Sequence, residues 1–362
     1  MNTARCVRLD ERVCWDRVAG GMPVYVLPKP GWRRCSALLA IDFGALDRRL
    51  WWRNGSAPLE LPAGVAHFLE HLLFAKRAGD ITERFGALGA EVDADTAFAH
   101  TGFTCACRGG CDQALQLLFE LAFTAWLDDR GVRREREIIA HEIELSADEL
   151  DWVSYFRALE TVYPEQPLAE DIAGTPQSLS QITAPLLRRC HQTMYRAATA
   201  ALYVCGDVDP AAVTALADRQ LARYPAVAAR PVGQVRRQPV TPSPPRRLTL
   251  GLPTARPHLT LAFGDPCPGR LGRALLAREL ALELALYALL GPGSAFGRDA
   301  YEAGLIDAAS FGITVNIEPT FGACLLSGET TQPAALEELV LGTLERARRC
   351  GLDPEDFALA RR

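Results

Sequence analysis

Apolar and polar residues alternate along the chain with two spacings, one typical of strands and one typical of helices. Short apolar runs near glycine or proline predict strands at 21–28 and 36–45, which we expect to pair as a hairpin. The mixture of small, polar and apolar residues across 91–107 predicts two more strands, and 199–210 predicts a strand followed by the start of a helix. Apolar residues at helical spacing predict helices at 62–74, 80–88, 111–127, 132–147, 151–163 and 184–195.

The second half of the chain repeats the order of a strand followed by an apolar helix. Its predicted elements are strands at 248–250, 258–264 and, as a pair, within 311–327, and helices at 273–290, 291–305 and 333–349. We therefore predict an α+β fold of two related domains, each an antiparallel β-sheet with helices packed on one face. Residues 1–225 form the first domain, 226–247 a linker rich in Pro, Arg and Val, and 248–362 the second domain.

Composition narrows the classes of function. The 362 residues are 49% hydrophobic and 23% charged, which suits a globular protein of about two domains. The net charge of −5 argues against a nucleic-acid partner or an anionic membrane. Apolar runs stay below the roughly 18 residues of a membrane span, and the N-terminus lacks the apolar segment of a secretory signal. Eleven scattered cysteines predict reduced thiols and a cytoplasmic location.

One apolar stretch carries candidate catalytic chemistry, the pattern H-x-x-E-H formed by His67, Glu70 and His71. Residues four apart share a helix face, so the two imidazoles project together and can fill two positions of a tetrahedral zinc site. A carboxylate between them can accept a proton from water. The alternative is a buried amphipathic helix whose histidines are satisfied within the core.

A later helical pattern supplies two carboxylates that are seven residues apart, Glu135 and Glu142, and therefore lie on nearly the same face. An H-x-x-E-H motif followed after some seventy residues by E-x6-E resembles the insulinase-like (pitrilysin) zinc metallopeptidases. The resemblance implies a mitochondrial-processing-peptidase-like metallohydrolase fold and a Zn²⁺ ion held by His67, His71 and Glu142. It also implies that Glu135 supports these ligands and that Glu70 acts as the catalytic base.

In the same family, an edge strand pairs with the backbone of the substrate, commonly through the pattern Asn-Ala-x-Thr. The corresponding residues here are Asp93, Ala94 and Thr96, with Asp93 in place of the asparagine. Side-chain amide donation is lost, although pairing through main-chain groups could persist. The alternative is an ordinary exposed edge strand.

The second domain departs from the pattern of single-chain members, in which an Arg and a Tyr seven apart assist the substrate carbonyl. Aligned on Gly304 and Leu305, those positions are Ala300 and Asp307. The chain thus resembles the zinc-motif subunit of bacterial two-chain members, which implies a bacterial protein with a related partner subunit that supplies the Arg and Tyr. The resemblance spans nearly the whole chain, and it also leads us to expect that the second domain is incomplete at its C-terminus.

The sequence therefore predicts a zinc-dependent metalloendopeptidase that acts on peptides, with two alternatives. One is a maturation protease dedicated to a ribosomally made peptide or a cofactor precursor, and the other is a catalytically silent scaffold subunit. Cys105, Cys107 and Cys111 match no common structural zinc spacing and lack a fourth ligand nearby, so we expect no metal there.

Overall fold

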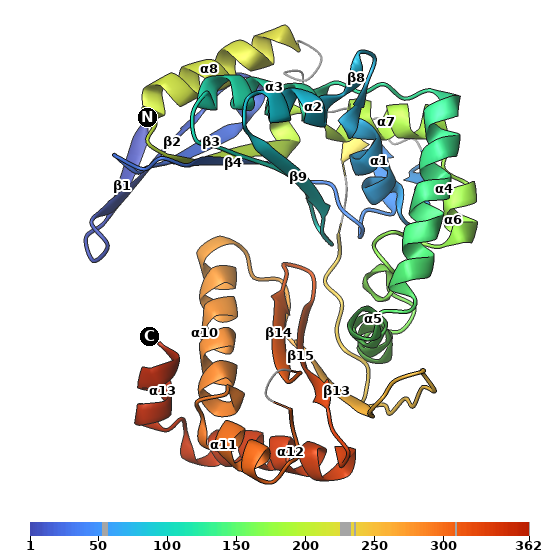
Figure 1. The fold of residues 1–362 in the computed structure, drawn as a ribbon, viewed down its shortest axis with the longest axis vertical. Helices are drawn as coiled ribbons and strands as arrows, with labels where there is room; N and C mark the ends of the chain where they lie inside the picture. Colours follow the sequence, from blue (N-terminus) through green and yellow to red (C-terminus); the bar gives the residue numbers. More distant parts are fainter. Residues whose placement is uncertain (53–56, 225–232, 235–236, 308–309, 362) are drawn as a thin grey trace. The chain divides into compact units, whose positions relative to one another are not determined.

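The computed structural model describes residues 1–52, 57–224, 233–234, 237–307 and 310–361 (Figure 1). They divide into two compact units, the first made of Met1–Glu144 and Asp171–Arg236 and the second of Leu145–Glu170 and Arg237–Arg362. The segment 145–170 thus belongs to the second unit, although the sequence places it in the first predicted domain. Residues 226–232 and 235–236 of the predicted linker at 226–247 lie outside the described residues, and the predicted boundaries remain predictions.

The described residues of the first unit form a seven-stranded sheet in the order β1-β2-β3-β11-β4-β10-β9. The strands are β1 (Asn2–Cys6), β2 (Glu11–Arg17), β3 (Pro23–Pro28), β11 (Ala200–Gly206), β4 (Cys35–Ile41), β10 (Thr101–Cys107) and β9 (Glu91–Thr96). The predicted hairpin of β3 with β4 is wrong, because β11 lies between them, parallel to β3 and antiparallel to β4. All other neighbouring strands of this sheet are antiparallel.

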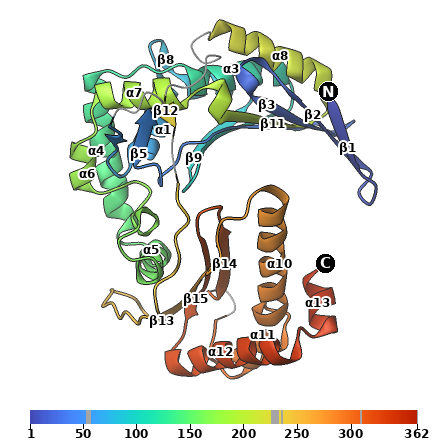
Figure 2. The same cartoon turned by 180° about the vertical axis from the view of Figure 1, so that it is seen from behind.

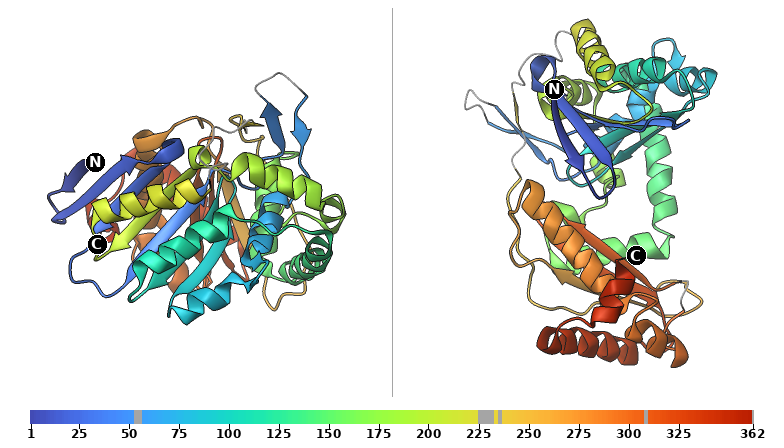
Figure 3. Two further views of the ribbon diagram at one scale, coloured as in Figure 1. Left: turned by 90° about the horizontal axis from the view of Figure 1, so that it is seen from above. Right: turned by 90° about the vertical axis from the view of Figure 1, so that its left-hand side faces the viewer.

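Helices cover one face of this sheet, as Figures 1 and 3 show for α3 and α8. The helices of the unit are α1 (Val65–Phe74), α2 (Ile81–Ala87), α3 (Cys111–Phe123), α4 (Asp129–Ser146), α6 (Pro176–Ser180), α7 (Ala184–Met194) and α8 (Pro210–Arg223). Every second residue of β4 is buried, namely Ala37, Leu39 and Ile41, and these residues belong to one core with the apolar stripe of α3. The side chains that alternate along the strands and those spaced along one face of the helices therefore pack in a single core.

Short strands lie outside the main sheet. They are β5 (Arg49–Trp52), β6 (Leu59–Glu60) and β12 (Gly233–Gln234), which form a small sheet, and β7 (Ala75–Lys76) and β8 (Gly79–Asp80), which pair with each other. The expectation of reduced cysteines is wrong for Cys35 and Cys111, which the structure joins by a disulfide. Seventy-six residues separate these two cysteines, so only the tertiary packing brings them together.

In the second unit, the described residues form an antiparallel sheet in the order β13-β15-β14 (Figure 2). Its elements are α5 (Leu150–Val162), β13 (His258–Gly264), α10 (Gly272–Leu290), α11 (Ala295–Glu302), β14 (Gly312–Ile317), β15 (Gly322–Glu329), α12 (Pro333–Cys350) and α13 (Pro354–Ala360). The predicted strand at 248–250 is wrong, since these residues have no regular structure. Among the helices of the described residues, none combines the length and the apolar character that crossing a bilayer requires.

Helix α5 is held in the second unit by hydrogen bonds as well as by packing against β13. The hydroxyl of Tyr163, the residue after α5, donates to the carbonyl oxygen of Gly322 at 2.6 Å. The amide of Asn316 donates to the hydroxyl of Tyr155 at 2.6 Å. These partners lie more than 150 residues away in sequence, which is why the helical pattern of 151–163 alone does not reveal which sheet it covers.

The start of α1 is fixed by two close backbone approaches that require glycine. Gly64 caps the helix with a φ of 81°, and a Cβ there would collide with the carbonyl oxygen of Ala173. Gly174 has a φ of 83°, and its Cβ would lie 2.7 Å from the carbonyl oxygen of Ala63. The hydroxyl of Ser178 also donates to that oxygen at 3.0 Å. The segment 173–178 therefore determines where α1 begins.

We expect Gly64→Ala to destabilise the protein by about 1–3 kcal/mol, because it adds both a strained backbone conformation and a steric collision. The matched control is Gly86→Ala in α2, where a Cβ meets nothing within 4 Å and φ is not positive. There, alanine should be neutral or stabilise by up to about 1 kcal/mol. Urea unfolding of the two variants and the wild type measures both effects, and equal stabilities would contradict this view of α1.

Candidate metal centre

Helix α1 directs two histidines to the same point. The Nε2 atoms of His67 and His71 lie 3.2 Å apart, and the ring centroids are 4.5 Å apart. The rest of the helix is buried almost all round, with Phe68 and Leu69 in the core of the first unit. The two rings therefore occupy the narrow stripe of α1 that the core leaves open.

Helix α4 brings two carboxylates to the same place. One oxygen of Glu142 lies 3.7 Å from Nε2 of His67, and the other lies 3.5 Å from Nε2 of His71. Glu135 lies two turns earlier, and its carboxylate accepts a hydrogen bond from Nδ1 of His71 at 3.0 Å. The predicted ligands and the predicted supporting residue thus come together in the structure, all within the first unit.

The position of α4 depends on Arg136, which lies beside Glu135 in the sequence. Its guanidinium donates to the carbonyl oxygens of Leu179 at 3.0 Å and of Ile182 at 2.7 Å. Each acceptor is a carbonyl at or just beyond the end of the short helix α6, where carbonyl groups lack partners within the helix. The contact holds α4 at the height along its axis at which Glu135 and Glu142 meet the histidines.

These residues fit a bound zinc ion. The ligand atoms of His67, His71 and Glu142 all lie within 4.8 Å of one another, and two nitrogens with one carboxylate oxygen are a known catalytic zinc set. Burial, with a smaller contribution from the charge of His71, lowers the pKa of His67 to about 3, so its ring is neutral and keeps a free lone pair. Two Nε2 atoms that face each other and a carboxylate are most simply satisfied by a shared cation.

The environment of His71 acts in the opposite direction. Burial alone would lower its pKa, but the hydrogen bond to Glu135 and the charges of Glu70 and Glu142 outweigh burial, and the net pKa is raised. With its proton on Nδ1 directed to Glu135, the ring of His71 leaves the lone pair of Nε2 directed toward His67 and Glu142. Glu135 therefore orients this ring, as carboxylates behind metal-bound histidines commonly do.

Glu70 is almost fully buried, with 7% of its surface exposed, although it lies between the two histidines in the sequence. One of its oxygens accepts a hydrogen bond from the hydroxyl of Thr96 at 2.6 Å. Burial raises the pKa of Glu70, and the charges of Asp95 and Glu142 raise it further, against the lowering effects of Thr96 and His71. A carboxyl whose pKa is moved toward neutrality is suited to accept and return a proton.

The candidate substrate strand is β9, which lies at the edge of the sheet that the described residues form. Asp93, Ala94 and Thr96 all belong to it. The carboxylate of Asp93 accepts a hydrogen bond from the amide of Ala94 at 2.9 Å, so it is engaged with its own strand. Sequence analysis missed the hydrogen bond of Thr96 to Glu70 and the raising of the pKa of Glu70 by Asp95. Both depend on the register of β9 and on its contact with α1, and neither leaves a local signal in the sequence.

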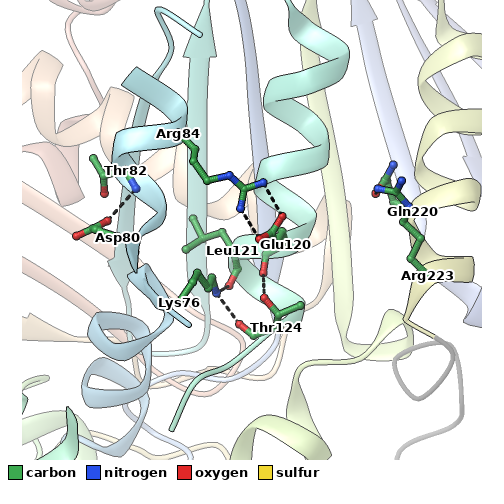
Figure 4. A network of polar contacts seen from close by, with 9 residues as sticks. All are labelled: Lys76, Asp80, Thr82, Arg84, Glu120, Leu121, Thr124, Gln220 and Arg223. Carbon is green, nitrogen blue, oxygen red and sulfur yellow. Dashed lines mark hydrogen bonds and ion pairs between the residues drawn. The ribbon is translucent and has the colours of Figure 1, made fainter. Parts of the chain in front are cut away.

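The end of α1 is anchored by a further network, drawn in Figure 4. Lys76 follows α1, and its ammonium donates to the carbonyl oxygens of Leu121 and Thr124 at the end of α3. Burial lowers the pKa of Lys76 to about 7, with a smaller lowering by Arg84 and a raising effect of Glu120. Arg84 of α2 forms an ion pair with Glu120. The Lys76 contacts thus join the segment after the histidine helix to the end of α3, and the ion pair joins α2 to the same helix.

The sequence matches two family models, one described as insulinase (peptidase family M16) at residues 51–176 and one as the peptidase M16 inactive domain at residues 181–362. His67, His71, Glu135 and Glu142 all lie within the first match. An uncharacterized zinc protease of Bacillus subtilis, YmfH, is 31% identical over 358 residues, which is 98% of this chain and 82% of that protein. An uncharacterized zinc protease of Mycobacterium leprae is 29% identical over 56% of this chain and 45% of its own length.

Solved structures agree with these matches. A putative M16-like peptidase from Alicyclobacillus acidocaldarius superposes with a TM-score of 0.89 and 30% identity, over 97% of this chain and 82% of that one. Pitrilysin superposes with a TM-score of 0.72 at 17% identity, over 98% of this chain and 38% of its own, and shows the fold alone. The predicted α+β fold of two related domains is therefore confirmed, and the chain belongs to the insulinase family of peptidases, family M16.

Proposed function

We propose that this chain is a zinc-dependent metalloendopeptidase whose Zn²⁺ is held by His67, His71 and Glu142. The observation that carries the proposal is the convergence of these three side chains from α1 and α4 on one point. The names of the related zinc proteases of Bacillus subtilis and Mycobacterium leprae support it. When bound, Zn²⁺ would supply Lewis acidity toward a peptide carbonyl and a water molecule.

The side chains around this point divide the remaining work. Glu70 accepts a proton from water and returns it to the leaving amine, a role that its raised pKa supports. Thr96 occupies one oxygen of Glu70 and so fixes the direction of the other. Glu135 holds the ring of His71 in the tautomer that leaves Nε2 free.

The peptide substrate is proposed to add to the open edge of β9. The side chains of Thr96 and Asp93 are already hydrogen-bonded, to Glu70 and to the amide of Ala94. Pairing of the substrate with β9 would therefore depend on main-chain groups more than on these side chains. Recognition of backbone rather than side chains suits hydrolysis of peptides of varied sequence. A maturation protease with a dedicated substrate would use the same residues and would differ in the pockets that flank them.

A partner subunit is part of the proposal. Ala300 occupies the position of the missing Arg, and it is fully buried on α11 within the core of the second unit. An arginine introduced there would bury an unpaired charge, so substitution at 300 is a poor way to rebuild the missing group. Asp307, at the position of the missing Tyr, is a carboxylate and cannot donate a hydrogen bond to an oxyanion as a tyrosine hydroxyl does. A related chain that supplies both groups is the simpler source.

We expect the purified chain to bind about one Zn²⁺ through the proposed site, measured by metal analysis after mild chelation. His71→Ala removes one of three ligands and should abolish that binding. The matched control is His141→Ala, next to Glu142 in the sequence but with 71% of its side chain exposed and 3.7 Å from Glu144. Full zinc retention in His71→Ala, or equal loss in both variants, would contradict the proposed ligand set.

We expect Glu70→Gln to keep zinc while peptide hydrolysis falls by at least about a hundredfold, because the amide cannot accept the proton. Glu137→Gln, an exposed glutamate on α4, controls for the loss of one negative charge. Hydrolysis of a quenched fluorescent peptide gives the rates, and metal analysis gives the occupancy. Loss of zinc would make Glu70 a ligand, whereas an unchanged trace activity in Glu70→Gln would favour the silent scaffold.

We expect the isolated chain to be a weak peptidase even with zinc bound. Lost stabilisation of a developing oxyanion costs about 2.7–4 kcal/mol, or roughly a hundred- to a thousandfold in rate. Adding a related chain that carries the Arg and Tyr should restore a factor of this size, and the gain should vanish when that arginine is replaced by alanine. Typical enzyme rates for the chain alone would rule out the need for a partner.

A further inference from the structure

Three cysteines of the first unit meet at the end of the sheet that is remote from the histidines. Cys35 is the first residue of β4, Cys107 is the last residue of β10, and Cys111 is the first residue of α3. Cys107 lies directly opposite Cys35 in the ladder of β10 with β4. The sulfur atoms of all three lie within 4.8 Å of one another.

The group of three in the structure differs in one member from Cys105, Cys107 and Cys111, the three cysteines for which the sequence led us to expect no metal. Cys105 lies opposite Ala37 in the ladder, and it is not part of the group of three sulfur atoms. Cys35 takes its place, from a strand that lies far away in the sequence. The expectation of no metal was based on spacing within 105–111, which could not include this residue.

The loop between two of these cysteines is short, although the set of three in the sequence matches no common zinc spacing. Cys107 and Cys111 are separated by three residues, within the two-to-four spacing common among paired cysteine ligands. Gly110, with a φ of 66°, turns the chain back so that both sulfurs face Cys35.

Cys111 has a favourable position of its own. As the first residue of the thirteen-residue helix α3, it lies where unpaired N–H groups and the helix dipole stabilise a negative charge. Cys35 and Cys111 are joined as a disulfide in the structure, while Cys107 is a buried free cysteine beside them. A disulfide engages only two of the three sulfurs and leaves the geometry of the third unexplained.

We propose that Cys35, Cys107 and Cys111, once reduced, form a three-thiolate site for one thiophilic d¹⁰ cation, Zn²⁺ or Cu⁺. Soft thiolate ligands select these ions, and three sulfurs leave a fourth position for water on Zn²⁺ or complete a trigonal site for Cu⁺. A dithiol reductant transfers two electrons and two protons to the Cys35–Cys111 disulfide, which becomes two thiols while the reductant becomes a disulfide. The three thiols then release three protons as the cation binds. The disulfide and the metal site are alternative states of the same residues.

This site is separate from the histidine centre. Thr101, at the other end of β10, lies opposite Thr96, the residue bonded to Glu70. Six residues along a strand separate Thr101 from Cys107, or about 20 Å. An ion at the cysteines therefore does not touch the reacting groups. It would instead join β4, β10 and α3 and raise the stability of the first unit.

The test uses the full chain, reduced and freed of metal with a chelator, and titrated with Cd²⁺ as the probe. Thiolate-to-cadmium charge-transfer absorption should saturate at about one equivalent. Cys107→Ser and Cys111→Ser should each weaken Cd²⁺ binding by more than the roughly 10- to 100-fold that loss of an outer partner costs. Cys205→Ser, on the adjacent strand β11 and outside the cluster, should leave the signal unchanged. Competition with Zn²⁺, and with Cu⁺ delivered from a coloured Cu⁺ chelator, identifies the preferred ion.

His71→Ala separates this proposal from the proposed function, because it should lose zinc at the histidines and keep the thiolate signal. A reduced chain without a saturable thiolate signal, or a signal unchanged in Cys107→Ser and Cys111→Ser, would overturn the proposal. Alkylation of the wild type, read by mass spectrometry, covers the case of variants that fail to fold. Cd²⁺ should protect Cys35, Cys107 and Cys111 together while the exposed Cys350 still reacts, and equal labelling with and without Cd²⁺ would also overturn it.

Discussion

The burial of α1 is the constraint on which the rest of the first unit depends. Seven of its ten residues are buried, and all of these except Glu70 are apolar, so only the stripe that holds His67 and His71 is left partly open. Each large apolar side chain placed in the core contributes about 1.5–3 kcal/mol, so rotating the helix to present other residues would forfeit several of these contributions. The Gly64 cap at one end and Lys76 at the other prevent the helix from sliding. The direction of the two imidazoles is therefore a property of the whole core.

The same burial creates the chemistry of the site at a cost in stability. Burial destabilises a carboxylate because it removes water. The hydrogen bond from Thr96 offsets this effect only in part, so the pKa of Glu70 is raised. The proposed proton transfer by Glu70 relies on this raised pKa, which a glutamate on the surface would lack. His67 is affected in the opposite sense, because burial disfavours its charged form and leaves a lone pair available. The apolar packing thus shifts both pKa values in the direction that the proposed roles of Glu70 and His67 require.

Sequence reasoning succeeded where the geometry is local. The spacing of His67 and His71 places both rings on one face of an α-helix, whatever the helix packs against. It failed where the geometry depends on distant partners. The apolar pattern of β3 and β4 is compatible with a hairpin, and nothing in it shows that β11 inserts between them, almost 160 residues later. The meeting of Glu142 with the histidines was anticipated only through resemblance to a family.

Strand register explains why the remaining details of both clusters stayed hidden. A shift of one residue in a ladder would turn every side chain of that strand to the other face. Strand β10 pairs with β9 on one side and with β4 on the other, so its register fixes Thr96 opposite Thr101 and also Cys35 opposite Cys107. The bond that orients Glu70 and the group of three sulfurs are thus consequences of one alignment of three strands. Reading the spacing along β10 alone suggests Cys105 as the neighbour of Cys107, whereas the ladder selects Cys35. Contacts along a strand follow from sequence, but contacts across strands require the register, and here the register sets the environment of both sites.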